Sequence, residues 1–275
     1  MKLEDIIDGK YEIVDGLINV DGNVTLVKET LLKIPFKFGI VTGNFDCSYN
    51  ELITLEGSPK IVGGNFDCNN NKLITLEGCP KYIAGFFYCN NNDLITLKGC
   101  PEELGRGFNC RNNQLTTLEG IPEISVKFFD CSYNKLTSLK GCPKEITESF
   151  NCGDNKLTSL KGCPKKVLEY FNCSFNELTT LKGSPKIIKG YFDCSHNQLK
   201  SLEGSPEKVG GNFNCGYNQL KSLEGRPEIV EGNFYCYYNQ LTSLEGFPEI
   251  VYGDFYGYGN PIVKKILGVI NRSSL

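Results

Sequence analysis

A single 21-residue step governs most of this 275-residue chain. Ten cysteines follow one another at this interval from Cys47 to Cys236, and a phenylalanine stands two residues before each of them. Columns of Asn, Leu, Gly and Pro keep the same interval, so the unit reads F-x-C-x-x-N-x-L-x-x-L-x-G-x-P-x-x-[IV] plus three variable residues. A chain built this way buries its apolar columns by stacking neighbouring units, because one unit cannot bury them alone.

The F-x-C segment of each unit predicts a short strand. Phe and Cys point to one side of it, and the residues that flank them point to the other. The ten residues from Glu56 to Asn65 lead to the next Phe and include Gly57 and Pro59, which disfavour a continuous helix. We therefore expect a mainly β solenoid with a parallel sheet on one side and extended or turn-like return segments on the other.

These columns resemble the leucine-rich-repeat signature L-x-x-L-x-L-x-x-N/C-x-L. The Phe, Cys, Asn and first Leu columns fill its fourth, sixth, ninth and eleventh places, over about residues 24 to 262. The unit looks most similar to the short-repeat class of bacterial effector proteins and to tandem FxCxxNxL arrays of bacteria, phages and large DNA viruses. The resemblance implies a right-handed leucine-rich-repeat solenoid with a concave parallel sheet and a tendency to bind proteins.

The two ends of the chain predict caps. Tyr11–Val14 and Leu17–Val20 flank Asp15-Gly16, a hairpin turn signal. Asn260-Pro261 predicts the N-cap and first residue of a helix, which then presents one apolar face. The predicted parts are an N-terminal hairpin cap at 1–23, about eleven repeats at 24–260, and a C-terminal helical cap at 261–275.

The fourteen cysteines predict neither a metal site nor a disulfide scaffold. There is no CxxC pair, and His196 is the only histidine, at what reads as a variable surface position. The main column is explained by core packing, and parallel-pointing side chains suit packing better than bridging, so we expect thiols. A second partial column beside the prolines is expected to be more exposed to redox chemistry: Cys79, Cys100, Cys142 and Cys163.

Composition narrows the functional classes. With 29 Lys and Arg against 32 Asp and Glu, the net charge of −3 offers no general attraction to nucleic acid. No apolar run is long enough for a secretion signal or a membrane span. No catalytic, cofactor or metal constellation emerges, so we expect a non-enzymatic, monomeric, cytoplasmic protein (in the host cytoplasm if viral) with a protein partner.

Two surfaces are candidate partner sites. The first is the concave face, where small polar residues of the early coils give way to tyrosines: Tyr170, Tyr191, Tyr235, Tyr237, Tyr256 and Tyr258. Tyrosine suits a contact surface because it offers area and a hydroxyl at low entropic cost. Stacking that only stiffens the last coils is the alternative.

The second surface is a patch of like charge between Lys140 and Lys189. Two columns supply it, one with Lys140, Lys161 and Lys182 and one with Lys144, Lys165 and Lys186. It predicts either an anion or acidic-partner site or an ordinary solvated face.

Taken together, the sequence predicts a protein-protein interaction module that binds its partner on the concave face. A structural component of a virion or surface layer, with end caps packed against copies of itself, is one alternative. Carbohydrate binding through the tyrosines is another.

Overall fold

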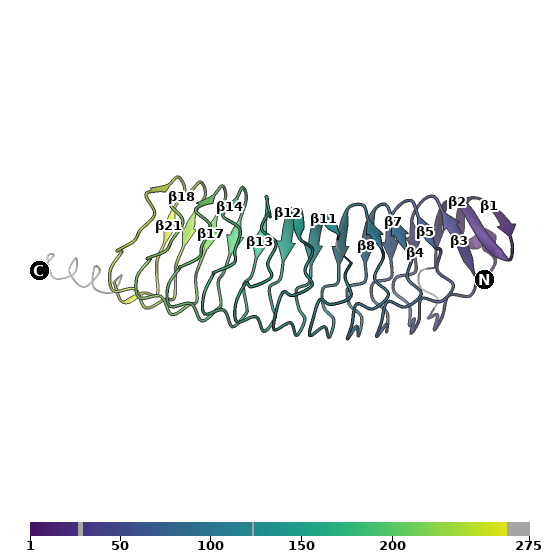
Figure 1. Cartoon of the computed structure of the whole chain (residues 1–275), viewed down its shortest axis with the longest axis horizontal. Coiled ribbons are helices and arrows are strands. Elements are labelled where there is room, and N and C mark those ends of the chain that lie inside the picture. Colours follow the sequence, from purple (N-terminus) through teal and green to yellow (C-terminus); the bar gives the residue numbers. More distant parts are fainter. Residues whose placement is uncertain (27–29, 123, 263–275) are drawn as a thin grey trace, which may run out of the picture. The chain divides into compact units, whose positions relative to one another are not determined.

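The computed structural model describes residues 1–26, 30–122 and 124–262. They form two compact units. Unit 1 comprises Met1–Leu136 with Gly141–Glu145, and unit 2 comprises Thr137–Lys140 with Ile146–Leu275. Figure 1 shows that each unit is a run of similar coils in which short strands recur.

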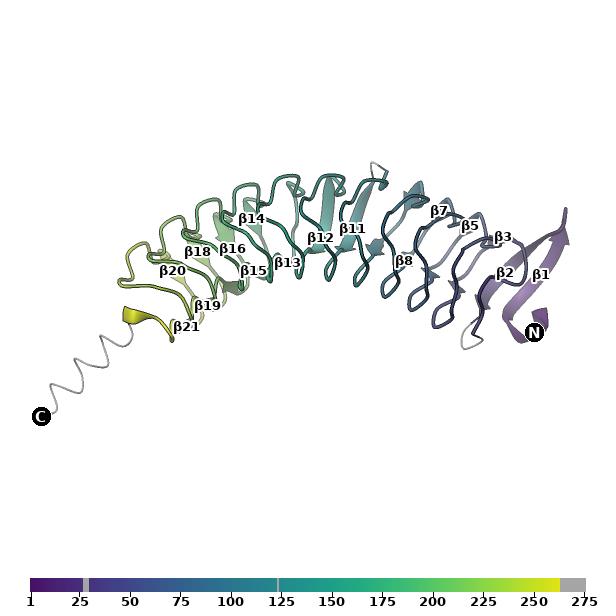
Figure 2. The same ribbon diagram turned by 90° about the horizontal axis from the view of Figure 1, so that it is seen from below.

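Unit 1 begins with a short 3-10 helix, η1 (Leu3–Asp5), and a hairpin of β1 (Ile7–Val14) and β2 (Leu17–Thr25). The strands pair antiparallel from Ile7 opposite Val24 to Val14 opposite Leu17. Asp15 and Gly16 both have positive φ, 51° and 75°, as a tight hairpin turn requires. Figure 2 shows this hairpin beside β3 (Phe38–Val41) at the N-terminal end of the unit. The predicted hairpin is confirmed.

The F-x-C segments of unit 1 form the main parallel ladder. Its strands after β2 are β4 (Phe45–Asp46), β6 (Phe66–Asp67), β8 (Phe86–Tyr88), β10 (Gly107–Asn109) and β11 (Ser125–Asp130). Each Phe lies opposite the next, so that Phe45 pairs with Phe66 and Phe66 with Phe87. The 21-residue step is therefore the register of the sheet, and it places like residues side by side.

A second, finer ladder runs along the return segments, for which the sequence predicts only an extended or turn-like backbone. In unit 1 it comprises β3, β5 (Ile61–Val62), β7 (Tyr82–Ile83) and β9 (Glu103–Leu104). Its inward residues belong to the aliphatic column; Val62 and Ile83, for example, are buried. Coils of equal length bring these backbones within pairing distance, and pairing satisfies their N–H and C=O groups.

Unit 2 repeats the two ladders. The main one comprises β12 (Glu145–Asn151, whose first residue belongs to unit 1), β13 (Phe171–Asn172), β15 (Phe192–Asp193), β17 (Phe213–Asn214), β19 (Phe234–Tyr235) and β21 (Phe255–Tyr256). The second comprises β14 (Ile187–Ile188), β16 (Lys208–Val209), β18 (Ile229–Val230) and β20 (Ile250–Val251). All of these pairings within unit 2 are parallel.

The core of each unit consists of the stacked Phe, Cys and Leu columns. The rings of Phe192 and Phe213 lie 5.5 Å apart and nearly parallel, and both are fully buried. At the last coil the Leu and Phe columns become exposed to solvent, since Leu244 and Phe255 are 41% and 37% exposed. The predicted C-terminal cap would lie beyond this coil, but only Pro261 and Ile262 of it fall within the described residues, where they are helical.

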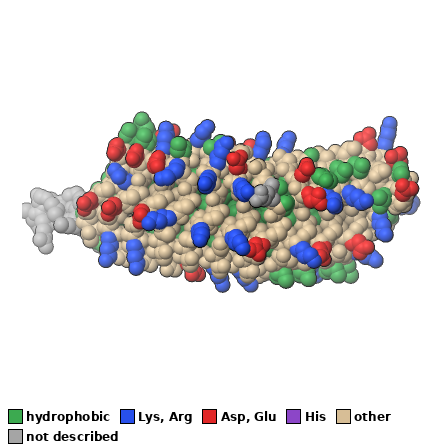
Figure 3. All heavy atoms as spheres, viewed as in Figure 1, with side chains coloured by type: hydrophobic (Ala, Val, Ile, Leu, Met, Phe, Trp, Pro, Cys, Tyr) green, Lys and Arg blue, Asp and Glu red, His purple; other side chains and the backbone are tan. Residues whose placement is uncertain are grey.

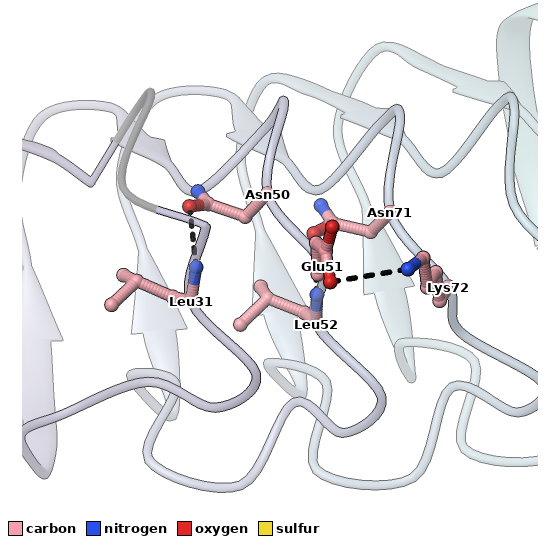
Figure 4. Close-up of polar contacts among 6 residues, drawn as sticks. All are labelled: Leu31, Asn50, Glu51, Leu52, Asn71 and Lys72. Carbon is pink, nitrogen blue, oxygen red and sulfur yellow. Dashed lines mark hydrogen bonds and ion pairs between the residues drawn. The ribbon is translucent and has the colours of Figure 1, made fainter.

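The asparagine column closes the bend after each strand (Figure 4). The Oδ1 atom of Asn71 accepts the N–H of Leu52 at 2.9 Å, while its Nδ2 donates to the carbonyls of Cys47 and Cys68 at 3.0 and 3.1 Å. The pattern continues to Asn260, which accepts from Leu241 and donates to Cys236. One amide thus joins successive coils, as the sequence predicts for a structural Asn.

The structure is a mainly β solenoid of stacked coils with very little helix, so the predicted fold class is confirmed. The cap and repeat boundaries at 1–23, 24–260 and 261–275 stay predictions.

Candidate functional site

The candidate site lies on the outward side of the main ladder of unit 2. Since Phe and Cys point into the core, the residues just before and after each Phe and just after each Cys point away from it. We call this surface the open face of unit 2; it is the face that the sequence predicts to be concave. All six predicted tyrosines lie on it.

The tyrosines stack in three face-to-face pairs. The ring centroids are 5.5 Å apart for Tyr170–Tyr191, 4.8 Å for Tyr235–Tyr256 and 5.1 Å for Tyr237–Tyr258. The members of each pair are one 21-residue step apart, so the register of the sheet brings them together. Such offset stacks contribute about 0.5 to 1.5 kcal/mol each beyond area burial, so the rings do brace the coils.

Five of the six tyrosines also line one hollow of about 550 Å³. Tyr191 lies on one side of the coil that carries Asn212 and Asn214, and Tyr235 and Tyr237 lie on the other. That intervening coil has no aromatic residue on the open face, which is why a hollow forms there. The complete lining is Tyr191, Asn212, Asn214, Tyr235, Tyr237, Tyr256 and Tyr258. Tyr170 stacks on Tyr191 but does not line the hollow.

Gly216 has no side chain, and the Tyr237 ring occupies the space that a Cβ at this position would need. A Cβ at this position would come within 2.5 to 2.8 Å of three atoms of the Tyr237 ring. Ser174 and Ser195 occupy the equivalent place in the two preceding coils, so the backbone there accepts a side chain. Glycine is therefore required here by the packing of the Tyr237 ring and not by the backbone conformation of the turn.

Asp193 and Asn214 connect the two walls of the hollow. The Oδ2 atom of Asp193 accepts the hydroxyl of Tyr191 at 3.0 Å and the Nδ2 of Asn214 at 3.4 Å. The same Nδ2 lies 3.4 Å from the hydroxyl oxygen of Tyr237. Burial, followed by the charge of Asp193, raises the pKa of Tyr191, and burial also raises the pKa of Tyr237. Both hydroxyls therefore keep their protons at neutral pH.

The outer tyrosines are held in a similar way. The Nδ2 of Asn233 donates to the hydroxyl oxygen of Tyr235 at 2.8 Å, and the Tyr256 hydroxyl donates to Asp254 at 3.3 Å. The charge of Asp254 is the main cause that raises the pKa of Tyr256. These bonds hold the rings in fixed orientations before any ligand arrives.

A second ring stack borders the open face, and sequence reasoning missed it. Phe175, His196, Tyr217 and Tyr238 stack in order, with centroids 4.0, 4.2 and 4.7 Å apart. His196 is thus part of an aromatic ladder and not an isolated surface residue. Burial, partly opposed by Asp193 and Asp154, lowers its pKa. The 21-residue interval among these four residues was the signal that could have revealed the ladder.

The lysine patch is less positive than its sequence suggests. Lys182 pairs with Glu203 at 2.8 Å and Lys186 with Glu207 at 2.9 Å, each across one coil step. Lys144 belongs to unit 1, whereas Lys140, Lys161 and Lys165 belong to unit 2. Acidic and basic side chains also lie interspersed on the face shown in Figure 3. This arrangement favours a solvated, ion-paired surface, and binding between Lys140 and Lys189 stays a prediction.

The cysteines of the main column, such as Cys47 and Cys194, are buried thiols. Burial also raises the pKa of Cys79 and raises that of Cys100 to about 12. The four cysteines of the second column are partly exposed, whereas those of the main column are buried, so the predicted difference in exposure is confirmed. The raised pKa values keep the thiols of Cys79 and Cys100 protonated at neutral pH, and the redox chemistry of this column stays a prediction. The predicted thiol state of the purified protein as a whole stays a prediction.

Among residues 1–26, 30–122 and 124–262, no group of three or more His, Cys, Asp or Glu side chains is placed to hold a metal ion. Within the same ranges, no helix has the length and apolar character of a membrane span.

Comparison with known proteins identifies the fold. No family model matches the chain, and no curated protein matches it. Among solved structures, YopM from Yersinia enterocolitica is similar, with 19% identity and a TM-score of 0.51 over 86% of this chain and 64% of that one. A structure described as YopM, a leucine-rich effector protein from Yersinia pestis, gives 17% identity and a TM-score of 0.50 over 86% and 77%.

This chain therefore spans somewhat less than two thirds of the YopM from Yersinia enterocolitica. At these identities the likeness concerns the fold. With the 21-residue unit, the Asn ladder and the parallel strands, it shows that the chain is a leucine-rich-repeat solenoid.

Proposed function

We propose that this chain is a non-catalytic binding module whose protein partner contacts the open face of unit 2. The observation that carries the proposal is the hollow itself, where five of the predicted tyrosines meet. The fold it shares with a leucine-rich effector protein supports a role in interaction. We further propose that it acts as a cytoplasmic monomer.

Ring stacking favours a protein partner over a carbohydrate. In each tyrosine pair the two rings cover one another's faces, with interplanar angles of 5° to 14°. Each of these rings therefore keeps only one face open, and its edge and hydroxyl make up the rest of its exposed surface, a combination that suits polypeptide contacts. Tyrosines at the centre of a protein interface contribute on the order of 2 kcal/mol each when they act as hot spots.

The test replaces Tyr235 and Tyr256 together by Asn, the residue found at these places in β17 and β13. The double variant removes one stacked pair, so we expect its Tm to fall by no more than about 3 °C. Capture of the partner from lysate of the source cell should weaken at least about tenfold.

The matched control is Tyr133→Asn in unit 1, since Asn112 holds the same left-handed position one coil earlier. It should leave capture unchanged. A double variant that loses many degrees of stability yet still captures its partner would show that the rings are only a brace. If the wild-type chain elutes from size-exclusion chromatography as a large assembly, the result would favour the alternative role as a structural component of a virion or surface layer.

A further inference from the structure

We infer that the hollow on the open face of unit 2 receives an arginine side chain from a basic polypeptide segment. The inference rests on the proposed function and specifies the partner's chemistry. It follows from the charges of the face, from the hydrogen-bonding groups that remain available, and from an arginine contact already present in unit 1.

The charged residues of the open face of unit 2 and its bordering ring ladder are all acidic. From Ser149 to Gly259, these positions include Asp154, Asp193 and Asp254 and contain neither lysine nor arginine. The lysines of the unit lie elsewhere; Lys182 and Lys186, for instance, are paired with glutamates on the return segments. A partner that approaches this face therefore meets negative charge, which attracts a basic segment and repels an acidic one.

The hydrogen-bonding groups of the hollow favour a donor ligand. The Nδ2 of Asn214 is directed to Asp193 and Tyr237, and the Tyr191 hydroxyl is directed to Asp193. The hydroxyl oxygens of Tyr235 and Tyr237 each accept one hydrogen bond, from Asn233 and Asn214, and each keeps a second lone pair. The Asp193 carboxylate accepts from Tyr191, Asn214 and Ser195 and, with about four acceptor sites, can accept one more bond. A guanidinium group carries five N–H donors and no acceptor, so it complements this set.

The aromatic walls distinguish arginine from lysine. Tyr191 on one side and Tyr235 and Tyr237 on the other are two coil steps apart, roughly 10 Å at 4.8 Å per strand. A planar guanidinium can stack on a ring and still reach a carboxylate, whereas an ammonium is a strongly hydrated point charge.

Unit 1 contains such a contact within its own chain. The Arg111 guanidinium lies over the ring of Tyr133, 4.6 Å from its centroid. Both residues line a hollow of about 440 Å³ that also includes Asp130 and Asn109. An arginine, a tyrosine and a carboxylate thus come together on the corresponding face of unit 1, where the chain supplies the arginine. In the hollow of unit 2 the partner supplies it.

The test measures binding of four short fluorescent peptides to the full chain by anisotropy. They share a Gly/Ser background and differ only in carrying arginine, citrulline, lysine or glutamate. Citrulline keeps the shape of arginine without its charge. We expect the arginine peptide to bind at least about tenfold more tightly than the citrulline peptide, and more tightly than the lysine peptide. Raising salt from about 50 to 200 mM should weaken it.

Two variants assign this binding to the hollow. Asp193→Asn retains the Oδ1 that accepts the Ser195 N–H, as Asn172 does for Ser174, so the coil is preserved. Gly216→Ser adds a side chain that would overlap the Tyr237 ring and so displaces the ring from its position. Each should weaken the arginine peptide at least about fivefold. The control Glu203→Gln removes one negative charge from the same unit, at the ion pair with Lys182, and should have no effect.

The possible results separate this inference from the proposed function. Equal binding of the arginine and citrulline peptides, tighter binding of the glutamate peptide, or no saturable binding of any of the four would overturn the arginine assignment. If partner capture still falls with Tyr235→Asn and Tyr256→Asn, the open face remains the binding surface for a partner of other chemistry. If arginine binding is insensitive to Asp193→Asn and Gly216→Ser, the hollow is not its site.

Discussion

The side chain of Asp67, on the outward side of the main ladder of unit 1, destabilises the folded state at neutral pH. It stands in β6 where Asn109 stands in β10, and burial raises its pKa to about 6, with the neighbouring Asp46 contributing in the same direction. Because the folded state holds this proton more tightly than the unfolded state, stability contributed at Asp67 is greatest at acidic pH. It is lost as pH rises from about 4 through about 6.

We therefore expect Asp67→Asn to stabilise unit 1 at neutral pH. Asn keeps the Oδ1 that accepts the Asn69 N–H at 2.9 Å and removes the partly buried charge. The gain should be about 1 to 2 kcal/mol near pH 7.5 after allowance for solvent screening, and close to zero near pH 4. Urea unfolding at both pH values measures it, with the exposed Asp93→Asn as control. A gain that is the same at both pH values would contradict the assignment.

His196 predicts the opposite pH response in unit 2. Its pKa lies below the ordinary value because the ring stack desolvates it, so the unfolded state takes up a proton first as pH falls. Stability contributed at His196 is therefore present above the ordinary histidine pKa and is lost as pH falls from that value through the lower pKa of the folded state. His196→Tyr, which copies Tyr217, should remove this loss between about pH 7 and pH 5 in urea unfolding. An unchanged pH profile would contradict the role given to His196.

At the scale of the element, the asparagine bend does more for each coil than the short strand it follows. The side chain of Asn113 accepts the Leu94 N–H at 3.0 Å and donates to the carbonyls of Cys89 and Cys110 at 3.1 and 3.0 Å. The main-ladder strand in that coil is only Gly107–Asn109. A two- or three-residue strand persists because the amides of its own coil and of the next coil, Asn113 and Asn134, both donate to the carbonyl of Cys110, just after its carboxyl end.

Asn113→Ala should therefore be costly. It leaves the buried Leu94 N–H without its acceptor and deprives two carbonyls of a donor, for a loss of about 3 to 5 kcal/mol. The exposed neighbour Gln114→Ala should change stability by less than about 0.5 kcal/mol. Urea unfolding of the two variants side by side gives the comparison. Similar urea midpoints for the two variants would mean that water can replace the hydrogen bonds of the Asn113 side chain.

The sequence predicts these elements unevenly, for physical reasons. Period-2 alternation in F-x-C and the 21-residue interval predict which side chains enter the core and which tyrosines share the open face. The second ladder at β5 (Ile61–Val62) is not predicted, because it depends on how sharply the return segment bends. Residue intervals alone do not specify side-chain orientation in space. The packing of Tyr237 over Gly216 and the stacking of His196 both depend on that orientation.

At the scale of the whole molecule, both units follow one rule: each coil pairs with the coils one step before and after it. In unit 1 Phe66 lies opposite Phe45 and Phe87, and in unit 2 Phe213 lies opposite Phe192 and Phe234. Stability in such an array is approximately a sum of coil and interface contributions. What differs along the chain is the open face, so the chain can vary this exposed surface without altering its core.

This rule predicts the outcome of removing one coil from unit 1. Deleting Phe66–Phe86, one complete step, joins Asn65 to Phe87 and leaves every column in register. The ion pairs lost, such as Lys72 with Glu51, are exposed and contribute little. The shortened chain should keep its far-ultraviolet circular dichroism spectrum and a cooperative urea transition. Deleting only Phe66–Thr75 joins Asn65 to Leu76 and places leucine in the phenylalanine column, so that chain should aggregate or unfold. If both deletions are equally soluble and equally folded, coil-by-coil stacking does not hold unit 1 together.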